Sequence, residues 1–122
     1  MSDIKKILIA DDDPSIVDAL QIMLEDAGYD VKTTVNGETV FQMMDEQPDL
    51  LLLDISMSGI DGRDVCRDLK KNERTRHIPI IIISANKDTA QIAKEAGADD
   101  FITKPFEMDV LLEKVEKHTS NK

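Results

Sequence analysis

Short runs of apolar residues recur along the chain, and each run is bounded by polar or turn-forming residues. Runs of this length are typical of β-strands. The first, third and fourth runs are almost continuously apolar, which is the pattern of strands covered by other elements on both faces. The five predicted strands span residues 6–10, 30–34, 49–53, 79–83 and 99–102.

Between these runs, apolar residues recur at the spacing of an α-helix. The clearest case is residues 14–27, where the apolar side chains share one face and Gly28 follows as a helix stop. Pro48 and Gly97 end two of the later helices. The other predicted helices span residues 38–46, 62–72, about 89–96 and 107–118.

The alternation of strand and helix with short connections predicts an α/β fold. Crossovers between parallel strands are right-handed, so we expect an open, doubly wound sheet of five parallel strands with five helices on its two faces. No linker or repeat interrupts the pattern, and we expect a single domain over residues 1–122 with a core at about 5–117. The residues of its functional site should lie beyond the carboxyl ends of the strands.

Length and charge restrict the class of protein further. The chain has 122 residues, enough for one hydrophobic core, and a formal net charge of −10. This charge disfavours direct binding to nucleic acid or membranes and favours a partner protein whose surface is locally basic or apolar. The longest apolar run is far too short to span a bilayer and no secretory signal is recognised, so we expect a cytoplasmic protein.

Some polar residues have a structural interpretation. Cys66 lies among apolar residues of a predicted helix, which favours a buried, unreactive thiol. His77 and His118 have no matching partners in the sequence and are expected at the surface. We expect the acidic pair 99–100 to be a solvated turn and Lys70 to belong to a solvated helix end.

Candidate chemistry appears where the predicted strands end. Residues 11–13 are three consecutive aspartates directly after the first strand, and Asp54 follows the third. Ser84 follows the fourth strand and Lys104 the fifth. Because the carboxyl ends of parallel strands meet at one edge of a sheet, acids from the first and third strands, a hydroxyl and a lysine should converge there.

This combination of groups suits metal-assisted phosphoryl transfer. Carboxylates crowded in a half-buried cleft repel one another, and a hard divalent cation such as Mg²⁺ relieves that repulsion. A carboxylate in such a site can attack a phosphoryl group, since the metal and an ammonium neutralise the charge on the transferring oxygens. The sequence therefore predicts Asp54 as the nucleophile, with Lys104 and Ser84 contacting phosphoryl oxygens.

Four segments, residues 7–14, 51–62, 82–85 and 96–106, resemble the marker segments of response-regulator receiver domains of two-component systems. They occur in the order and at the spacings of that family. The resemblance implies a stand-alone receiver that accepts a phosphoryl group from a histidine kinase or a histidine phosphotransfer protein. We accordingly expect the flavodoxin-like strand order 2-1-3-4-5.

The resemblance also implies a metal site. Asp11 and Asp12 would hold Mg²⁺, or alternatively Mn²⁺, with Asp12 as a direct ligand and Asp11 acting partly through water. Asp54 would be both a metal ligand and the phosphorylation site. The backbone carbonyl of Ser56 resembles the family's third protein ligand.

A switch is implied by the same resemblance. Lys104 corresponds to the phosphate-binding lysine, Ser84 to the switch hydroxyl and Phe101 to the switch aromatic, and the bond before Pro105 is expected to be cis. Activation should change the face formed by helix four, strand five and helix five, where a downstream protein target would bind. The interval 85–97 is about two residues shorter than is common in the family, which predicts a fourth helix of about two turns.

We expect slow loss of the phosphoryl group. By resemblance, Ser56 and Asn86 flank the water that hydrolyses the aspartyl phosphate, and neither can take a proton from that water. The chain would thus be a phosphoacceptor signalling protein that catalyses its own phosphorylation and slow autodephosphorylation, rather than an enzyme with a separate substrate.

Other interpretations remain beside this one. Asp13 before Pro14 is explained by helix capping alone, and Asp61 by a turn at a helix start. An aspartyl-phosphate phosphohydrolase is the alternative from another class, but it needs an acid two residues after the nucleophile, where Ser56 stands. A flavodoxin-like nucleotide binder is the third, and no glycine-rich phosphate loop follows the first strand.

Overall fold

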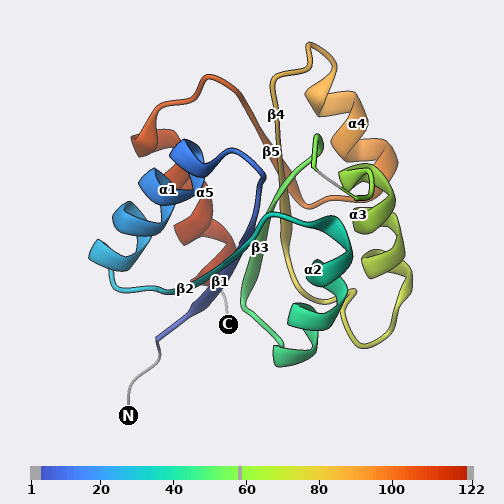
Figure 1. Cartoon of the computed structure of the whole chain (residues 1–122), viewed down its shortest axis with the longest axis horizontal. Helices are drawn as coiled ribbons and strands as arrows, with labels where there is room; N and C mark the ends of the chain where they lie inside the picture. Colours follow the sequence, from blue (N-terminus) through green and yellow to red (C-terminus); the bar gives the residue numbers. More distant parts are fainter. Residues whose placement is uncertain (1–3, 58, 121–122) are drawn as a thin grey trace.

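The computed structural model describes residues 4–57 and 59–120. Within these residues strands and helices alternate along the chain (Figure 1). The strands are β1 (Lys6–Ala10), β2 (Asp30–Thr34), β3 (Leu50–Asp54), β4 (Ile80–Ser84) and β5 (Asp100–Thr103). The helices are α1 (Pro14–Asp26), α2 (Gly37–Met43) with the short 3-10 turn η1 (Met44–Glu46), α3 (Gly62–Lys71), α4 (Thr89–Ala96) and α5 (Met108–Thr119).

The strands form one parallel sheet in the order β2-β1-β3-β4-β5. The predicted α/β class, the parallel sheet and its strand order are therefore confirmed. The last three strands each begin and end one residue later than predicted, because backbone pairing includes the polar residue at the end of the strand. Asp54 pairs with Ile83, and Ser84 with Thr103, as the last partners of their ladders.

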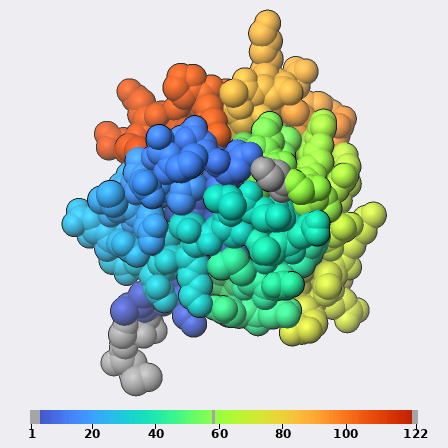
Figure 2. Space-filling view, in the orientation of Figure 1, coloured from blue at the N-terminus to red at the C-terminus, as the bar shows by residue number. Residues whose placement is uncertain are grey.

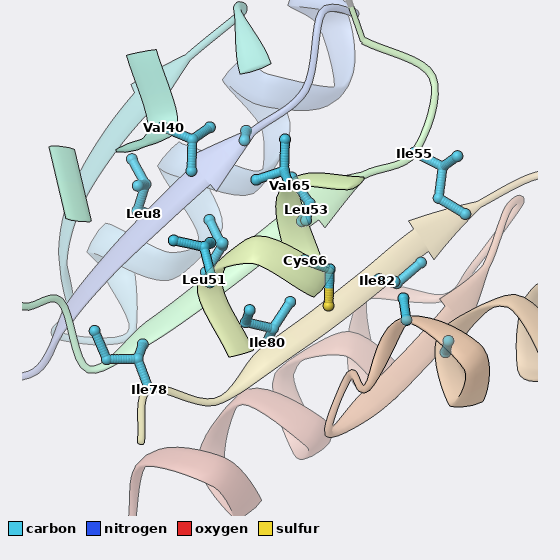
Figure 3. Close-up of a cluster of buried hydrophobic side chains, with 14 of the residues drawn as sticks. Leu8, Val40, Leu51, Leu53, Ile55, Val65, Cys66, Ile78, Ile80 and Ile82 are labelled. Carbon is cyan, nitrogen blue, oxygen red and sulfur yellow. The ribbon is translucent and has the colours of Figure 1, made fainter. Parts of the chain in front are cut away.

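Helices cover both faces of the sheet, with α1 and α5 on one face and α2, α3 and α4 on the other (Figure 1). Each face has its own cluster of buried apolar residues, because alternate side chains of a strand point to opposite faces. Figure 3 shows the cluster beneath α2, α3 and α4, where Leu51 and Leu53 of β3 meet Ile80 and Ile82 of β4. All five residues of β3 and of β4 are buried, which explains their continuous apolar runs.

Local signals set the helix ends. The Asp13 carboxylate accepts a hydrogen bond from the Ser15 N–H at 3.0 Å, with Pro14 at the first helical position, so the capping interpretation is confirmed. Asp61 caps α3 in the same way, through the Arg63 N–H at 2.8 Å. Helix α4 is eight residues long, about two turns as predicted.

Two further expectations about the fold have clear outcomes. Cys66 is fully buried, and this burial raises the pKa of its thiol to about 11, as expected for an unreactive cysteine. Among the described residues, the helices are all too short or too polar to cross a membrane.

Candidate functional site

Two buried aspartates lie side by side at the carboxyl edge of the sheet. Strands β1 and β3 are neighbours and Ala10 pairs with Leu53, so Asp11 and Asp54 follow at the same level. Asp11 is fully buried and Asp54 is 4% exposed, whereas Asp12 is exposed. One carboxylate oxygen from each of these three residues lies within 4.8 Å of the others. The structure thus brings together the three acids that the sequence suggested for a metal site.

Lys104 lies between the two buried carboxylates. Its Nζ atom is 3.3 Å from Asp11 Oδ2 and 3.6 Å from Asp54 Oδ1. The backbone N–H of Lys104 donates to the Ser84 carbonyl at 2.8 Å, which ties the loop after β5 to the end of β4. The peptide bond to Pro105 is cis, as the resemblance implied. A single ammonium therefore faces both buried acids.

The charge balance in this site is unfavourable to ionised Asp54. Burial and the neighbouring charge of Asp11 raise the pKa of Asp54 to about 6, although Lys104 and the Ser56 N–H act in the opposite direction. The excess of negative charge and the all-oxygen set of ligands fit a hard divalent cation. Asp11, Asp12 and Asp54 are the residues that could hold it.

Ser84 and the two predicted tuning residues line a hollow of about 550 Å³ beside the acids. Ser84 is buried at the end of β4, and its Oγ accepts a hydrogen bond from the Asn86 N–H at 2.9 Å. Ser56 and Asn86 are exposed and both line this hollow, one from the β3–α3 loop and one from the β4–α4 loop. Their roles stay predictions.

Phe101 is half-buried on β5 and packs against the core cluster beneath α4. Lys114 of α5 covers its ring, with Nζ 5.2 Å from the ring centre. The same ammonium donates to Asp100 at 2.7 Å, and His118 contacts the other oxygen of Asp100 at 2.9 Å. A small polar network therefore joins the predicted switch aromatic to α5.

This network corrects several expectations. Asp100 is not a solvated turn residue. Partial burial acts to raise the pKa of Asp100, but hydrogen bonds from Lys114 and His118 hold this pKa down at about 2. His118 is half-buried with Asp100 as its partner, so the expectation of an unpartnered surface residue is wrong, whereas His77 is exposed as expected. The physical reason is that two side chains of α5, Lys114 and His118, reach Asp100 at the start of β5, 14 and 18 positions earlier in the sequence.

Lys70 is also not a solvated helix end. Its ammonium donates to the carbonyls of Arg76 and Ile78 at 3.1 and 2.9 Å, and it forms an ion pair with Asp99 at 2.6 Å. Asp99 in turn accepts a hydrogen bond from the Ile80 N–H at 2.8 Å. Lys70 therefore joins the end of α3 to the starts of β4 and β5, at the edge of the sheet opposite the acids.

Sequence reasoning missed one contributor to the site, Gly62. A Cβ atom there would lie 2.5 Å from the Asp54 carbonyl oxygen and 2.7 Å from Ile55 Cα. Only glycine lets the first turn of α3 approach the strand end that carries Asp54. The Asp61–Gly62 pair was the available signal, but a helix start explained it completely.

Comparison with known proteins gives consistent matches along the chain. A family model described as the response regulator receiver domain matches residues 7–116. The DNA-binding dual master transcriptional regulator RpaA of Synechocystis is 42% identical over 114 residues, which cover 90% of this chain and 47% of that protein. The chain spans about half the length of the curated relatives it matches.

Solved structures agree with the family match. A response regulator from Chloroflexus aurantiacus superposes with a TM-score of 0.90 at 32% identity, over 97% of this chain and 99% of that one. The response regulator TrrA of Thermotoga maritima, in complex with Mg²⁺-BeF, superposes with a TM-score of 0.84 at 34% identity, over 94% and 99% of the two chains. The likeness therefore extends over nearly the whole chain.

Proposed function

Because the chain belongs to the response regulator receiver domain family of two-component signalling, we propose that Asp54 accepts a phosphoryl group from the phosphohistidine of a histidine kinase or histidine phosphotransfer protein. One observation supports this most directly. The ammonium of Lys104 lies within 4 Å of two buried carboxylates, Asp11 and Asp54, at the carboxyl edge of a parallel sheet. A carboxylate with an adjacent fixed cation is the arrangement that phosphoryl transfer to an aspartate requires.

Metal dependence is part of the proposal. The carboxylates of Asp11, Asp12 and Asp54 and the carbonyl of Ser56 would hold Mg²⁺, with Mn²⁺ as a substitute. The bound ion would supply positive charge to the phosphoryl oxygens. Lys104 alone cannot balance the negative charge of the site, because the acids outnumber it. The complex of TrrA with Mg²⁺-BeF supports this assignment.

Asp54, Lys104 and Ser84 would each have a separate role in the phosphoryl transfer. An oxygen of Asp54 forms the new bond to phosphorus while the bond from phosphorus to the donor's imidazole nitrogen breaks, and that nitrogen keeps the electron pair. Lys104 exchanges its contact with Asp54 for one with a phosphoryl oxygen. The Ser84 Oγ accepts from the Asn86 N–H, and its own proton then points to a second phosphoryl oxygen.

The donor would approach along an apolar groove of about 440 Å³ between α1 and the loop after β5. Ile16 and Ala19 line one wall, Pro105 and Phe106 the other, and Lys104 lies at the end nearest the acids. Because the transferred group must reach Asp54 beside Lys104, an apolar helix that carries the phosphohistidine is the partner we propose for this groove.

Phosphorylation would change the surface that binds a downstream protein. Ser84 would be drawn toward the phosphoryl oxygens, Phe101 would turn inward, and the surface of α4, β5 and α5 would change for a downstream protein target.

Slow autodephosphorylation is proposed because Ser56 and Asn86 carry no acidic or basic group.

The net charge of −10 argues that this region does not itself contact nucleic acid, and we propose a cytoplasmic location. The stand-alone character of the receiver stays a prediction.

Phosphorylation of the purified protein by acetyl phosphate or phosphoramidate tests the proposal. With Mg²⁺ the intact mass should increase by one phosphoryl group, and with EDTA it should not. Asp54→Asn should remain unmodified, whereas Asp13→Asn, which retains a capping side chain, should be modified like the wild type. Equal labelling of Asp54→Asn would refute the assignment of the site.

A further inference from the structure

The start of α2 and the loop between β3 and α3 meet in an unusually close contact. Gly37 is buried, and a Cβ atom on it would lie 2.1 Å from Ile60 Cγ2 and 3.1 Å from the Ile60 carbonyl oxygen. A Cβ atom on Gly59 would lie 2.9 Å from Asn36 Oδ1. Two consecutive residues of one segment thus face two consecutive residues of the other, and Figure 2 shows the two segments in contact on the surface.

The α2 side of this contact is held in place by its own bonds. Asn36 Oδ1 accepts the Glu38 N–H at 2.7 Å and caps the helix. The Asn36 carbonyl accepts a hydrogen bond from Thr39 Oγ1 at 2.9 Å. The next turn contributes Val40, which is fully buried in the core cluster. The start of α2 is therefore a firm surface, which we call the loop seat (Asn36 and Gly37).

The loop is also anchored at its base. The Ile55 carbonyl accepts the N–H groups of Met57 and Gly62 at 3.1 and 3.0 Å, which closes the loop at its base. Ser56 lies between this anchor and the loop seat, and its N–H helps to lower the pKa of Asp54. A shift of Ile60 would be transmitted through this short loop to Ser56.

We infer that Asn36 and Gly37 are positioning residues for the phosphorylation site. They hold the β3–α3 loop, and with it the Ser56 carbonyl, in the place needed for metal binding. The inference rests on the proposed function, because that function makes the carbonyl a metal ligand. None of the three acids of the proposed metal site comes from α2. The inference therefore makes the start of α2 a further determinant of metal affinity.

Gly37 offers a sharp test, because alanine there has opposite local and tertiary effects. The residue is outside the left-handed region, so alanine causes no backbone strain, and alanine has the higher helix propensity. The added methyl group, however, would collide with Ile60 Cγ2. The Ile60→Ala substitution removes that atom and leaves Ile60 Cβ, which is 3.5 Å from the new methyl position.

The experiment measures Mg²⁺ affinity by titration of amide chemical shifts, together with unfolding by denaturant. Gly37→Ala should weaken Mg²⁺ binding roughly 10-fold, the low end for residues that orient metal ligands. The double variant Gly37→Ala/Ile60→Ala should bind Mg²⁺ within about twofold of Ile60→Ala alone, since its methyl group no longer collides with Cγ2 and keeps only the contacts at 3.1 Å and 3.5 Å with the carbonyl oxygen and Cβ of residue 60. Gly97→Ala is the control: it strains a helix end at the opposite edge of the sheet, and it should lose stability with unchanged Mg²⁺ affinity.

Wild-type affinity in Gly37→Ala would overturn the inference and leave the proposed function intact. Equal weakening in Gly37→Ala and in the double variant would also overturn it, because the collision with Ile60 would not be the cause. A wild-type protein that binds no Mg²⁺ and accepts no phosphoryl group at Asp54 would overturn the proposed function and the inference together.

Discussion

The ammonium of Lys114 lies 5.2 Å from the centre of the Phe101 ring, where Asp100 holds it with a hydrogen bond of 2.7 Å. A cation in this position is attracted to the ring by about 0.5–1 kcal/mol. The contact exists while Phe101 is half-buried, so it favours the resting position of the ring. An inward turn of Phe101 would have to break it.

Lys114→Met should therefore make activation easier. Loss of about 0.5–1 kcal/mol from the resting state corresponds to a roughly two- to fivefold tighter apparent affinity for beryllofluoride in the presence of Mg²⁺. Titration followed by amide shifts of β5 and α5 would measure it. Lys114→Arg is the control, since it keeps a cation near both Asp100 and the ring. An affinity that is the same in all three proteins would show that the contact does not bias the switch.

Asp54→Asn should stabilise the protein in the absence of metal. Burial and Asp11 raise the pKa of Asp54 to about 6. A group whose pKa is raised by folding contributes stability that is complete below its unfolded pKa of about 4 and is lost as the pH rises through about 6. At pH 7.5 in EDTA the free energy of unfolding of the variant should be about 1–3 kcal/mol higher than that of the wild type.

The gain should be smaller at pH 5, where the folded wild type still carries a proton on Asp54. Denaturant unfolding at the two pH values measures the difference. Addition of Mg²⁺ should narrow the gap at pH 7.5, because the ion binds the folded wild type more tightly than the variant. A gap that does not change with pH would mean that the Asp54 charge costs nothing in the folded state.

The fold was predictable because its main determinants are local in sequence. The apolar runs of β3 and β4 and the spacing within α1 identify strands and helices without knowledge of partners. The approach of Asp11 to Asp54 was predictable too, since both residues lie at strand ends and parallel strands end at a common edge. The assigned roles of Ser84, Ser56 and Asn86 stay predictions.

What the sequence did not reveal depends on partners from other elements. Aspartates are rare in strands, so residues 99–100 looked like a turn. The predicted strand 99–102 did include Asp100, but its partners were missed: Lys114 and His118 of α5 pair with Asp100, and Lys70 of α3 pairs with Asp99. Pairs that are 14 to 29 positions apart leave no periodic signal. Close contacts at glycines, such as that of Gly62 with Asp54, also leave no pattern in the sequence.

Gly62→Ala should damage the site directly. The new Cβ atom would lie 2.5 Å from the Asp54 carbonyl oxygen, and backbone atoms cannot move aside easily. We expect a loss of about 1–3 kcal/mol in unfolding free energy and slower phosphorylation by acetyl phosphate, because the strand end that carries Asp54 must shift. Gly28→Ala should also lose stability, through strain at φ 101°, but should be phosphorylated at the wild-type rate. Normal phosphorylation of Gly62→Ala would show that the Asp54 position tolerates the added methyl group.

The lifetime of the phosphorylated form should respond to Asn86. This residue is exposed on the β4–α4 loop, lines the same hollow as Ser56 and bonds to Ser84, where water would approach the aspartyl phosphate. A well-placed general base accelerates proton transfer roughly 10²–10⁴-fold, and a carboxylate grafted onto a site not built for it should give much less, about 10-fold or below. Asn86→Glu should therefore shorten the lifetime, measured as loss of radiolabelled phosphoprotein in Mg²⁺ buffer without a phosphodonor.

Asn86→Gln separates basicity from size, because it has the length of glutamate but cannot accept the proton. It should decay at about the wild-type rate, and the Mg²⁺ affinity of each variant, measured separately, should account for none of the difference. Faster decay in Asn86→Gln as well as in Asn86→Glu would point to easier entry of water instead of base catalysis. Rapid decay in the wild type, unchanged by substitution of Asn86 or Ser56, would mean that another group controls hydrolysis of the aspartyl phosphate.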